Sequence, residues 1–377
     1  MEKIDFFRPQ IDEKEKELIK NALENPNSVD MVLDFENSIK KYFGVKHVIS
    51  TNNSTSAKHL ALCAMNIKRG DKIICSVNSF PNIAEVIRHF DAEPIFVDIK
   101  EDDFNINPQK FEEVIKANKS KKLKCAFITH MAGQSADMDE IYDIANRYEI
   151  DIIDDANKAL GATYKGRKIG GMSSKASCFK INSQFNIGIS TAGFIVTNDD
   201  DIAKRALLLR NHGIINNGGK NDNLGYIYDV IDIGTKYNLN TLDAAFCLAQ
   251  FQKVDMFIKK RIEIASIYNQ NLKDCPHIEI PVNNGEHTYS QYIIKVDKNR
   301  DSFARDLADF GISTALHYVP LNLLSYYKNK YNLKVNAFPS ALKTYQTVLS
   351  LPIYSDLKNE EIEYICSSIL KTAKSRV

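Results

Sequence analysis

The chain has 377 residues, with 49 Lys and Arg against 48 Asp and Glu. This length allows a large domain and a smaller one, each with its own core. The near balance of charge excludes an overall attraction to nucleic acid or to an anionic membrane surface. No apolar run approaches the ~18 residues of a membrane span, and the first residues lack a signal-peptide core. The seven cysteines form no Cys-x-x-Cys pair, so we expect reduced thiols, a cytoplasmic protein and no metal site.

Short β-rich runs alternate with helical patterns between about residues 45 and 200. We expect strands at 45–50, 72–76, 94–98, 124–129 and 150–155, and helices at 54–65, 82–90, 108–117 and 137–148. Strand and helix alternation at this spacing predicts an α/β domain, with a large and mostly parallel sheet covered by helices on both faces.

A different pattern begins near residue 240. We expect one long helix at 242–268, then an extended segment at 289–296 and helices at 302–310 and 359–374. These elements predict a smaller C-terminal α+β domain, residues 241–377, joined through the long helix to a large domain, residues 1–240, that begins with an N-terminal arm. The polar segment 216–223 is typical of a mobile loop.

Four features fall at the carboxyl ends of the predicted strands, where open α/β sheets bind ligands. Ser54 and Thr55 open a helix, and they suit either an anion site or an ordinary N-cap. Asp155 suits a partner for a cationic ring nitrogen or a solvated turn. Phe80 suits a ring that stacks on a planar cofactor or a core residue, and His130 suits a ligand contact or a structural role. Together they fit a phosphorylated, aromatic, cationic cofactor.

Further motifs occur in a fixed order along the chain. They include EPIFVD at 93–98, THMAGQ at 129–134, DDA at 154–156, LRNHG at 209–213 and HYVPL at 317–321. With these motifs the sequence resembles the DegT/DnrJ/StrS family of sugar-nucleotide aminotransferases. The family consists of fold-type-I, aspartate aminotransferase-like enzymes that depend on pyridoxal phosphate (PLP). The resemblance extends from about residue 7 to about residue 370.

The resemblance implies a role for each matching residue. It places Ser54 and Thr55 at the cofactor phosphate, Phe80 on the pyridine ring and Asp155 at the ring nitrogen. The other implied cofactor-binding residues are Lys158, Lys180, Asn182 and Lys236. Lys236 matches a residue that reaches the phosphate from the other subunit, which implies a homodimer with shared active sites. The implied substrate contacts are His130, His317 and Tyr318.

One segment departs from the family pattern. With Asn186-Ile187 as anchor, the Schiff-base lysine of the family falls on Phe185, which can neither form an aldimine nor move a proton. Lys180 replaces a serine that contacts phosphate. Lys158 stands where the family often has Gln or His, so it is either a substitute base or an ion-pairing lysine.

Three functions remain open. The first is an enzyme that acts on a keto-deoxysugar nucleotide in surface-polysaccharide or glycan biosynthesis. It would hold PLP or pyridoxamine phosphate (PMP) noncovalently, and Phe185 disfavours ordinary transamination. The second is a catalytically degenerate paralogue that binds a nucleotide sugar or serves as partner of an active homologue. The third is a PMP-dependent dehydratase-like or otherwise altered reaction. Fold alone does not decide among them.

Overall fold

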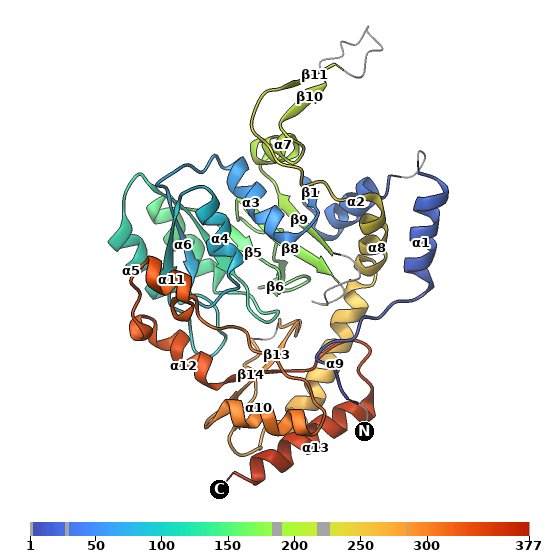
Figure 1. Cartoon of the computed structure of the whole chain (residues 1–377), viewed down its shortest axis with the longest axis vertical. Coiled ribbons are helices and arrows are strands. Elements are labelled where there is room, and N and C mark those ends of the chain that lie inside the picture. Colours follow the sequence, from blue (N-terminus) through green and yellow to red (C-terminus); the bar gives the residue numbers. More distant parts are fainter. Residues whose placement is uncertain (1–2, 27–29, 183–190, 217–226, 285, 377) are drawn as a thin grey trace.

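A seven-stranded sheet forms the centre of the molecule (Figure 1). The structure, a computed structural model, describes residues 3–26, 30–182, 191–216, 227–284 and 286–376. In spatial order the strands are β1 (His47–Thr51), β9 (Thr191–Thr197), β8 (Ala176–Asn182), β5 (Asp151–Asp155), β4 (Leu123–Thr129), β2 (Lys72–Ser76) and β3 (Glu93–Val97). β9 runs antiparallel to both neighbours, and the other neighbouring pairs are parallel. The mostly parallel sheet that the strand–helix alternation predicts is therefore confirmed.

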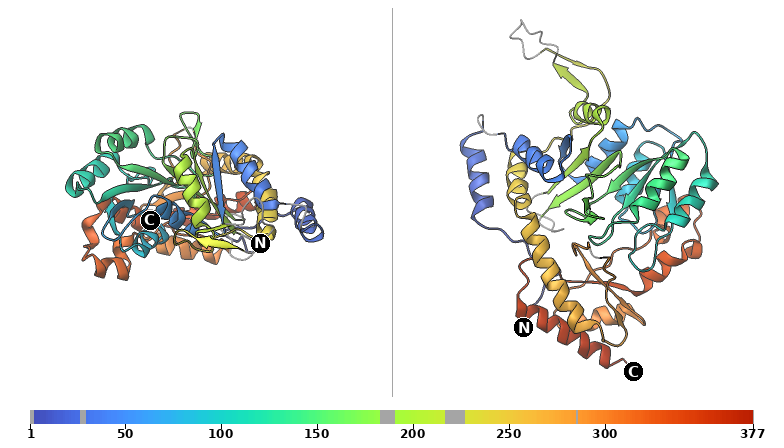
Figure 2. Two further views of the ribbon diagram at one scale, coloured as in Figure 1. Left: turned by 90° about the horizontal axis from the view of Figure 1, so that it is seen from above. Right: turned by 180° about the vertical axis from the view of Figure 1, so that it is seen from behind.

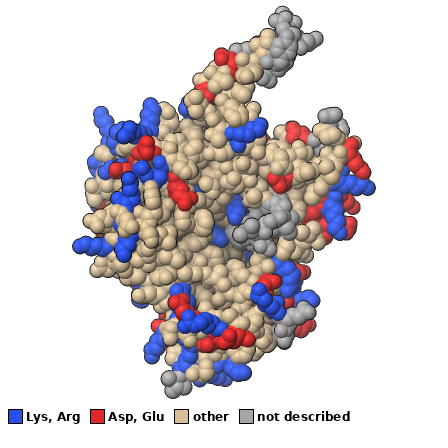
Figure 3. Space-filling view, in the orientation of Figure 1, with Lys and Arg blue, Asp and Glu red and all other residues tan. Residues whose placement is uncertain are grey.

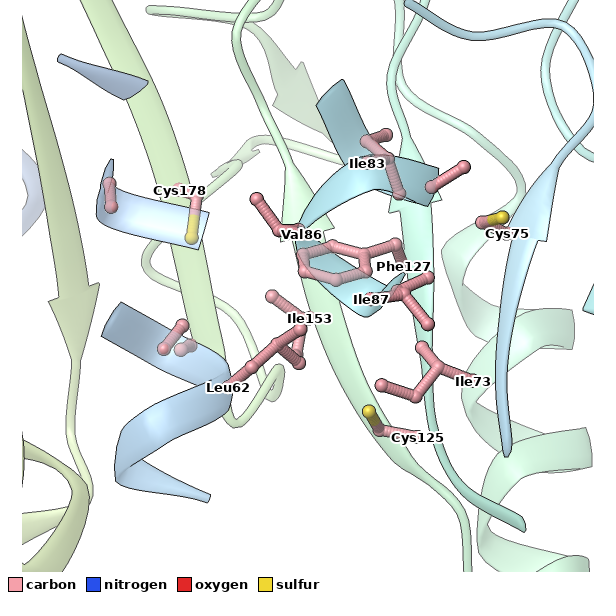
Figure 4. Close-up of a cluster of buried hydrophobic side chains, with 14 of the residues drawn as sticks. Leu62, Ile73, Cys75, Ile83, Val86, Ile87, Cys125, Phe127, Ile153 and Cys178 are labelled. Carbon is pink, nitrogen blue, oxygen red and sulfur yellow. The ribbon is translucent and has the colours of Figure 1, made fainter. Parts of the chain in front are cut away.

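Helices cover both faces of this sheet because successive residues of its strands are buried on opposite sides. On β4, Phe127 packs in one core cluster with Ile83 and Ile87 (Figure 4), whereas Ile128 packs with Phe111 on the other face. The first cluster includes residues of α3 (Ser54–Ala64), α4 (Asn82–His89) and α7 (Asp200–Leu209). The second includes residues of α5 (Pro108–Asn118) and α6 (Met138–Tyr148). A third cluster joins the β8–β9 side of the sheet to α2 (Met31–Phe43) and α8 (Thr241–Phe251), and α1 (Glu13–Glu24) contacts α8.

The C-terminal part contains a second, antiparallel sheet. It is formed by β12 (Ile278–Glu279), β13 (Tyr292–Val296) and β14 (Val348–Leu351). Its core is shared with α9 (Val254–Leu272), α10 (Arg300–Asp309) and α13 (Asn359–Lys374). Both termini lie near this end of the molecule (Figure 2). The remaining elements are β6 (Thr163–Tyr164), β7 (Arg167–Lys168), β10 (Ile214–Asn216), β11 (Tyr228–Val230), α11 (Ser325–Lys330), α12 (Pro339–Thr347) and two 3-10 turns, Leu321–Leu323 and Val335–Ala337.

The single long helix predicted at 242–268 is wrong, because α8 ends at Phe251 and α9 begins at Val254. Lys253 lies at the break, where its Nζ is 2.6 Å from Glu15 Oε1 of α1. α8 packs in the core beside the large sheet, whereas α9 shares the core of the small one (Figure 1).

A domain boundary at residue 240 stays a prediction, and two segments cross it. Ile4 forms a parallel bridge with Ile312 of the C-terminal part. Leu321 and Tyr327 belong to the core cluster of the large sheet. The predicted loop at 216–223 lies outside the described residues except for Asn216, which ends β10.

Gly193 of β9 allows the sheet to approach the start of α3 closely. A Cβ at this position would come within 2.6 Å of the Ser54 backbone nitrogen and closer still to the carbonyl of Asn53. A side chain here would therefore push the beginning of α3 away from the sheet.

We expect Gly193→Ala to lower the free energy of unfolding by about 1–3 kcal/mol, as overpacking of a tight site does. Gly171→Ala is the control, because its added Cβ would lie 3.1 Å from the nearest atom, the Phe43 carbonyl oxygen. Urea denaturation of both variants measures the difference. Equal stability of the two would show that the approach of β9 to α3 is not tight.

Candidate functional site

The beginning of α3 lies at the carboxyl end of β1 and exposes backbone N–H groups toward the sheet edge. The N-cap is Asn53, whose Oδ1 accepts a hydrogen bond from the Ser56 nitrogen at 2.9 Å. The alternative cap by Ser54 or Thr55 is therefore wrong. Ser54 Oγ accepts from Asn157 Nδ2 at 3.3 Å, and Thr55 Oγ1 accepts from Asn82 Nδ2 at 3.1 Å. Both hydroxyls thus lie at the N-terminus of α3, beside the loop after β5 and the start of α4. A helix N-terminus is a place where proteins bind anions.

One turn further along α3, Lys58 has no exposed surface. Its Nζ lies 2.9 Å from Oδ1 of Asp155, which is 6% exposed, and it donates to Asn82 Oδ1 at 3.4 Å. The carboxylate at the end of β5 is thus paired with a cation of the same chain. Neither the motifs nor the resemblance indicates Lys58. One signal was available: Lys58 precedes Ala61 and Leu62 by three and four residues, so it belongs to the buried face of the helix.

Two of the predicted lysines lie close to this pair. Lys158 is buried, and burial lowers its pKa to about 7; Lys180 and Lys58 contribute to the lowering, and Asp155 opposes it. Lys180, on β8, is half-buried, and burial followed by the charge of Lys58 lowers its pKa. These effects on the pKa values show that the side chains of Lys58, Lys158 and Lys180 lie close to one another, near Asp155.

The predicted substrate residues His317 and Tyr318 reach the same region from the C-terminal part. Burial, and then the charge of Lys158, hold the pKa of His317 well below its usual value. Burial, and then the charge of Asp155, raise the pKa of Tyr318. Phe80 is 57% exposed, and its ring lies 6.1 Å from that of Tyr318 in an edge-on arrangement. The structure thus brings these three residues together with Lys158 and Asp155.

A pocket beside this cluster contains a further cation that sequence reasoning missed. Its polar lining includes Asn157, Lys158, Lys180, Arg261 and Ser290, and the rest is mostly apolar, with Leu160, Ile181, Phe251, Val254 and Phe257. Arg261 of α9 is 5% exposed, and burial lowers its pKa to about 10. Figure 3 shows Lys or Arg side chains at the bottom of a hollow near the centre of this face. Three cationic side chains thus line this pocket.

The other predicted site residues lie apart from this cluster or outside the described structure. His130 has no exposed surface; its Nδ1 accepts from the Ala136 nitrogen at 3.1 Å, and its Nε2 lies 3.3 Å from Asp154 Oδ1. Lys236 is exposed and donates to Asn211 Oδ1 at 3.2 Å. Asn182 ends β8, and Phe185 lies outside the described residues. Roles for His130, Lys236, Asn182 and Phe185 stay predictions.

The two ends of the site differ in how well they suit PLP or PMP. The phosphate end fits, because α3 presents its N-terminus beside Ser54, Thr55 and Lys180. The ring-nitrogen end does not fit. A carboxylate holds a protonated pyridine only if its charge is available, and Lys58 already neutralises Asp155 at 2.9 Å. The site therefore suits an anion better than a cationic aromatic ring.

This fold and site define the class of the protein. The DegT/DnrJ/EryC1/StrS aminotransferase family model matches residues 9–370, and the chain belongs to this family. It is 33% identical to an uncharacterized protein of Methanocaldococcus jannaschii, over 97% of this chain and 96% of that protein. It is 30% identical to spore coat polysaccharide biosynthesis protein SpsC of Bacillus subtilis, covering 91% of this chain and 90% of SpsC. It is 29% identical to GDP-perosamine synthase of Caulobacter vibrioides, with 97% of each covered.

Solved structures of aminotransferases confirm the fold-type-I architecture. PseC of Helicobacter pylori, an aminotransferase of pseudoaminic acid biosynthesis, superposes with a TM-score of 0.88 at 25% identity, covering 99% of this chain and 100% of PseC. NtdA of Bacillus subtilis, solved with its cofactor PMP, gives a TM-score of 0.87 at 27% identity, covering 99% of this chain and 86% of NtdA.

All seven cysteines of the present chain are free thiols. In the described residues no helix is long and apolar enough to cross a membrane.

The lowered pKa of Lys158 predicts a pH-dependent stability. The amine is largely neutral in the folded state above about pH 7 but protonated in the unfolded state up to about pH 10.4. The unfolded state thus binds more protons in this window, so the contribution of Lys158 to stability rises with pH, by at most about 1.4 kcal/mol per pH unit. Below pH 7 the Lys158 amine is protonated in the folded state as well, and burial of its charge then lowers the free energy of unfolding by its full amount.

We therefore expect Lys158→Met to be more stable than wild type at pH 6.5 to 7, and this advantage to shrink between pH 7 and 9. Thermal melts of both proteins across this range give the difference in melting temperature. Taking the difference cancels the effect of the other titrating groups, which both proteins share. A constant difference at all pH values would mean that Lys158 keeps its ordinary pKa.

Proposed function

We propose that this chain acts on a nucleotide-linked keto-deoxysugar in polysaccharide or glycan biosynthesis, by a reaction other than ordinary transamination. The observation that carries the proposal is a cluster of cationic side chains: Lys158, Lys180 and Arg261 line one pocket, and Lys58 lies beside it at Asp155. A pyrophosphate suits this cluster because charge-assisted hydrogen bonds from Lys and Arg are strong in a partly desolvated pocket. The relatives named above support the sugar class, since their names concern polysaccharide and amino-sugar synthesis.

In this proposal each residue has a distinct task. Lys180 and Arg261 hold the phosphates, together with the N–H groups at the beginning of α3. Lys158, with a pKa of about 7, exists at neutral pH as a mixture of amine and ammonium, which suits proton transfer at the carbon next to the ketone. Tyr318, whose pKa is raised, stays protonated and can donate a hydrogen bond to a sugar oxygen. No step requires an amine at Phe185.

Lys180→Met should weaken the binding of a nucleoside diphosphate sugar by about 10- to 100-fold, the value of one charged hydrogen bond of about 1.5–3 kcal/mol. Lys124→Met is the matched control, because Lys124 lies on β4 of the same sheet, beyond β5, but is exposed. Isothermal titration with UDP-, GDP- and dTDP-linked sugars measures the affinity. Equal affinities of wild type and Lys180→Met would remove the pocket from consideration as the nucleotide-sugar site.

Lys158→Met should abolish exchange of hydrogen for deuterium at the carbon next to the ketone when a nucleotide-linked keto-deoxysugar is incubated with the protein in D₂O. Proton NMR follows the exchange, and Lys158→Arg, which keeps a charge but is never neutral, should also be inactive. If wild type binds the ligand without any exchange, the chain is a binding protein, as the degenerate paralogue would be.

The quaternary structure is a second part of the proposal. The β10–β11 hairpin projects from the body of the molecule (Figure 1). Its second strand and the residues around it expose five large apolar side chains: Ile227 at 43%, Tyr228 at 63%, Val230 at 50%, Ile231 at 55% and Ile233 at 86%. Clustered apolar exposure of this kind marks an interaction surface. We propose that the hairpin docks on a second copy, which would bring Lys236 to the other subunit's phosphate site.

The wild-type protein should therefore elute as a dimer in size-exclusion chromatography with light scattering, and the double variant Tyr228→Asp/Ile233→Asp should be monomeric. Val335→Asp is the control, since Val335 is also exposed, at 46%, but lies in a different part of the chain. A dimer that resists the double substitution would place the interface elsewhere.

A further inference from the structure

The position of Lys58 has a consequence that does not depend on which sugar is bound. Its side chain has no exposed surface, extends from the second turn of α3, and lies 2.9 Å from Asp155 Oδ1. Asn82, at the start of α4, holds the ammonium from another side at 3.4 Å. α3 and α4 both belong to the first core cluster, so the lysine cannot swing out to solvent without disrupting packed helices.

We propose that Lys58 is a built-in substitute for the ring nitrogen of pyridoxal cofactors, and that it prevents Asp155 from engaging a protonated pyridine. Lys58 supplies the positive charge that a pyridinium would supply. A second cation at this carboxylate would meet repulsion from Lys58 as well as attraction from Asp155. The chain therefore recognises the phosphate of PMP but gains little from its ring.

The surroundings of Asp155 support this assignment. Oδ1 of Asp155 accepts no hydrogen bond of good geometry from the described residues, so the contact with Lys58 is mainly one of charge. The side chains of Lys158 and Lys180 lie nearby, and their positive charge adds to that of Lys58 in opposing a cationic ring. Both effects act against a cationic ring and in favour of an anion.

Titration with PMP tests the inference, because PMP has no aldehyde and cannot react with lysines. Lys58→Leu should bind PMP at least tenfold more tightly than wild type, since it frees Asp155 for the ring nitrogen. Its affinity for inorganic phosphate, which has no ring, should not rise. Lys58→Leu/Asp155→Asn should return to within threefold of wild type. Lys58→Arg, which keeps the positive charge, should show no gain.

Removing one partner of a buried ion pair is costly, so Lys58→Leu could fail to fold. Lys58→Gln then replaces it, because the amide is polar but carries no charge, and a gain in PMP affinity of at least threefold is expected. Wild type that binds PMP as tightly as Lys58→Leu or Lys58→Gln would overturn the inference. Because no nucleotide sugar is present, this failure is distinct from a failure of the Lys180→Met experiment.

Discussion

A carboxylate at the end of the central strand must be compensated, and in this chain the compensating cation is Lys58. Asp155 lies on β5, between β4 and β8, at the sheet edge where α/β proteins bind ligands. A nearly buried carboxylate without a partner loses hydration that nothing replaces. A cofactor could provide the partner only while it is bound, whereas Lys58 provides it permanently. The choice of an internal partner therefore changes what the rest of the site can bind.

The consequences spread through the electrostatics of the pocket. Lys58, Lys158 and Lys180 influence one another's charge in this pocket. Burial and mutual repulsion lower the pKa of Lys158 and that of Lys180. A dianionic ligand would reverse this effect, because it would favour the ammonium forms and raise both pKa values. Ligand binding and proton uptake are thus coupled at this site, and phosphate affinity should fall as the amines lose their protons.

Much of the fold follows from local sequence patterns. The strand predicted at 72–76 is β2, and the strand at 124–129 differs from β4 by one residue, because each buried strand is a continuous apolar run between polar turns. The break between α8 and α9 could not be predicted, since no Pro or Gly marks it and the two helices pack in different cores. The same limit applies to Lys58. Its place on an apolar helix face signals a buried partner, but only the packing of α3 against β5 identifies that partner as Asp155.

Lys58 and the predicted departures at positions 180 and 185 are chemically consistent with one another. A Schiff-base lysine and a protonated ring work together, because the ring accepts the electrons that the aldimine releases. With Phe185 at the predicted position of the family lysine, the chain lacks the amine that would hold the cofactor covalently, and an unpaired Asp155 has less to gain. A lysine at position 58 removes the cost of that buried carboxylate, and a lysine at position 180 adds a charge toward the phosphate end. Substitution of any one of these residues changes the environment of the others, so reversal of a single position should restore less of the family's cofactor chemistry than reversal of positions 58 and 185 together.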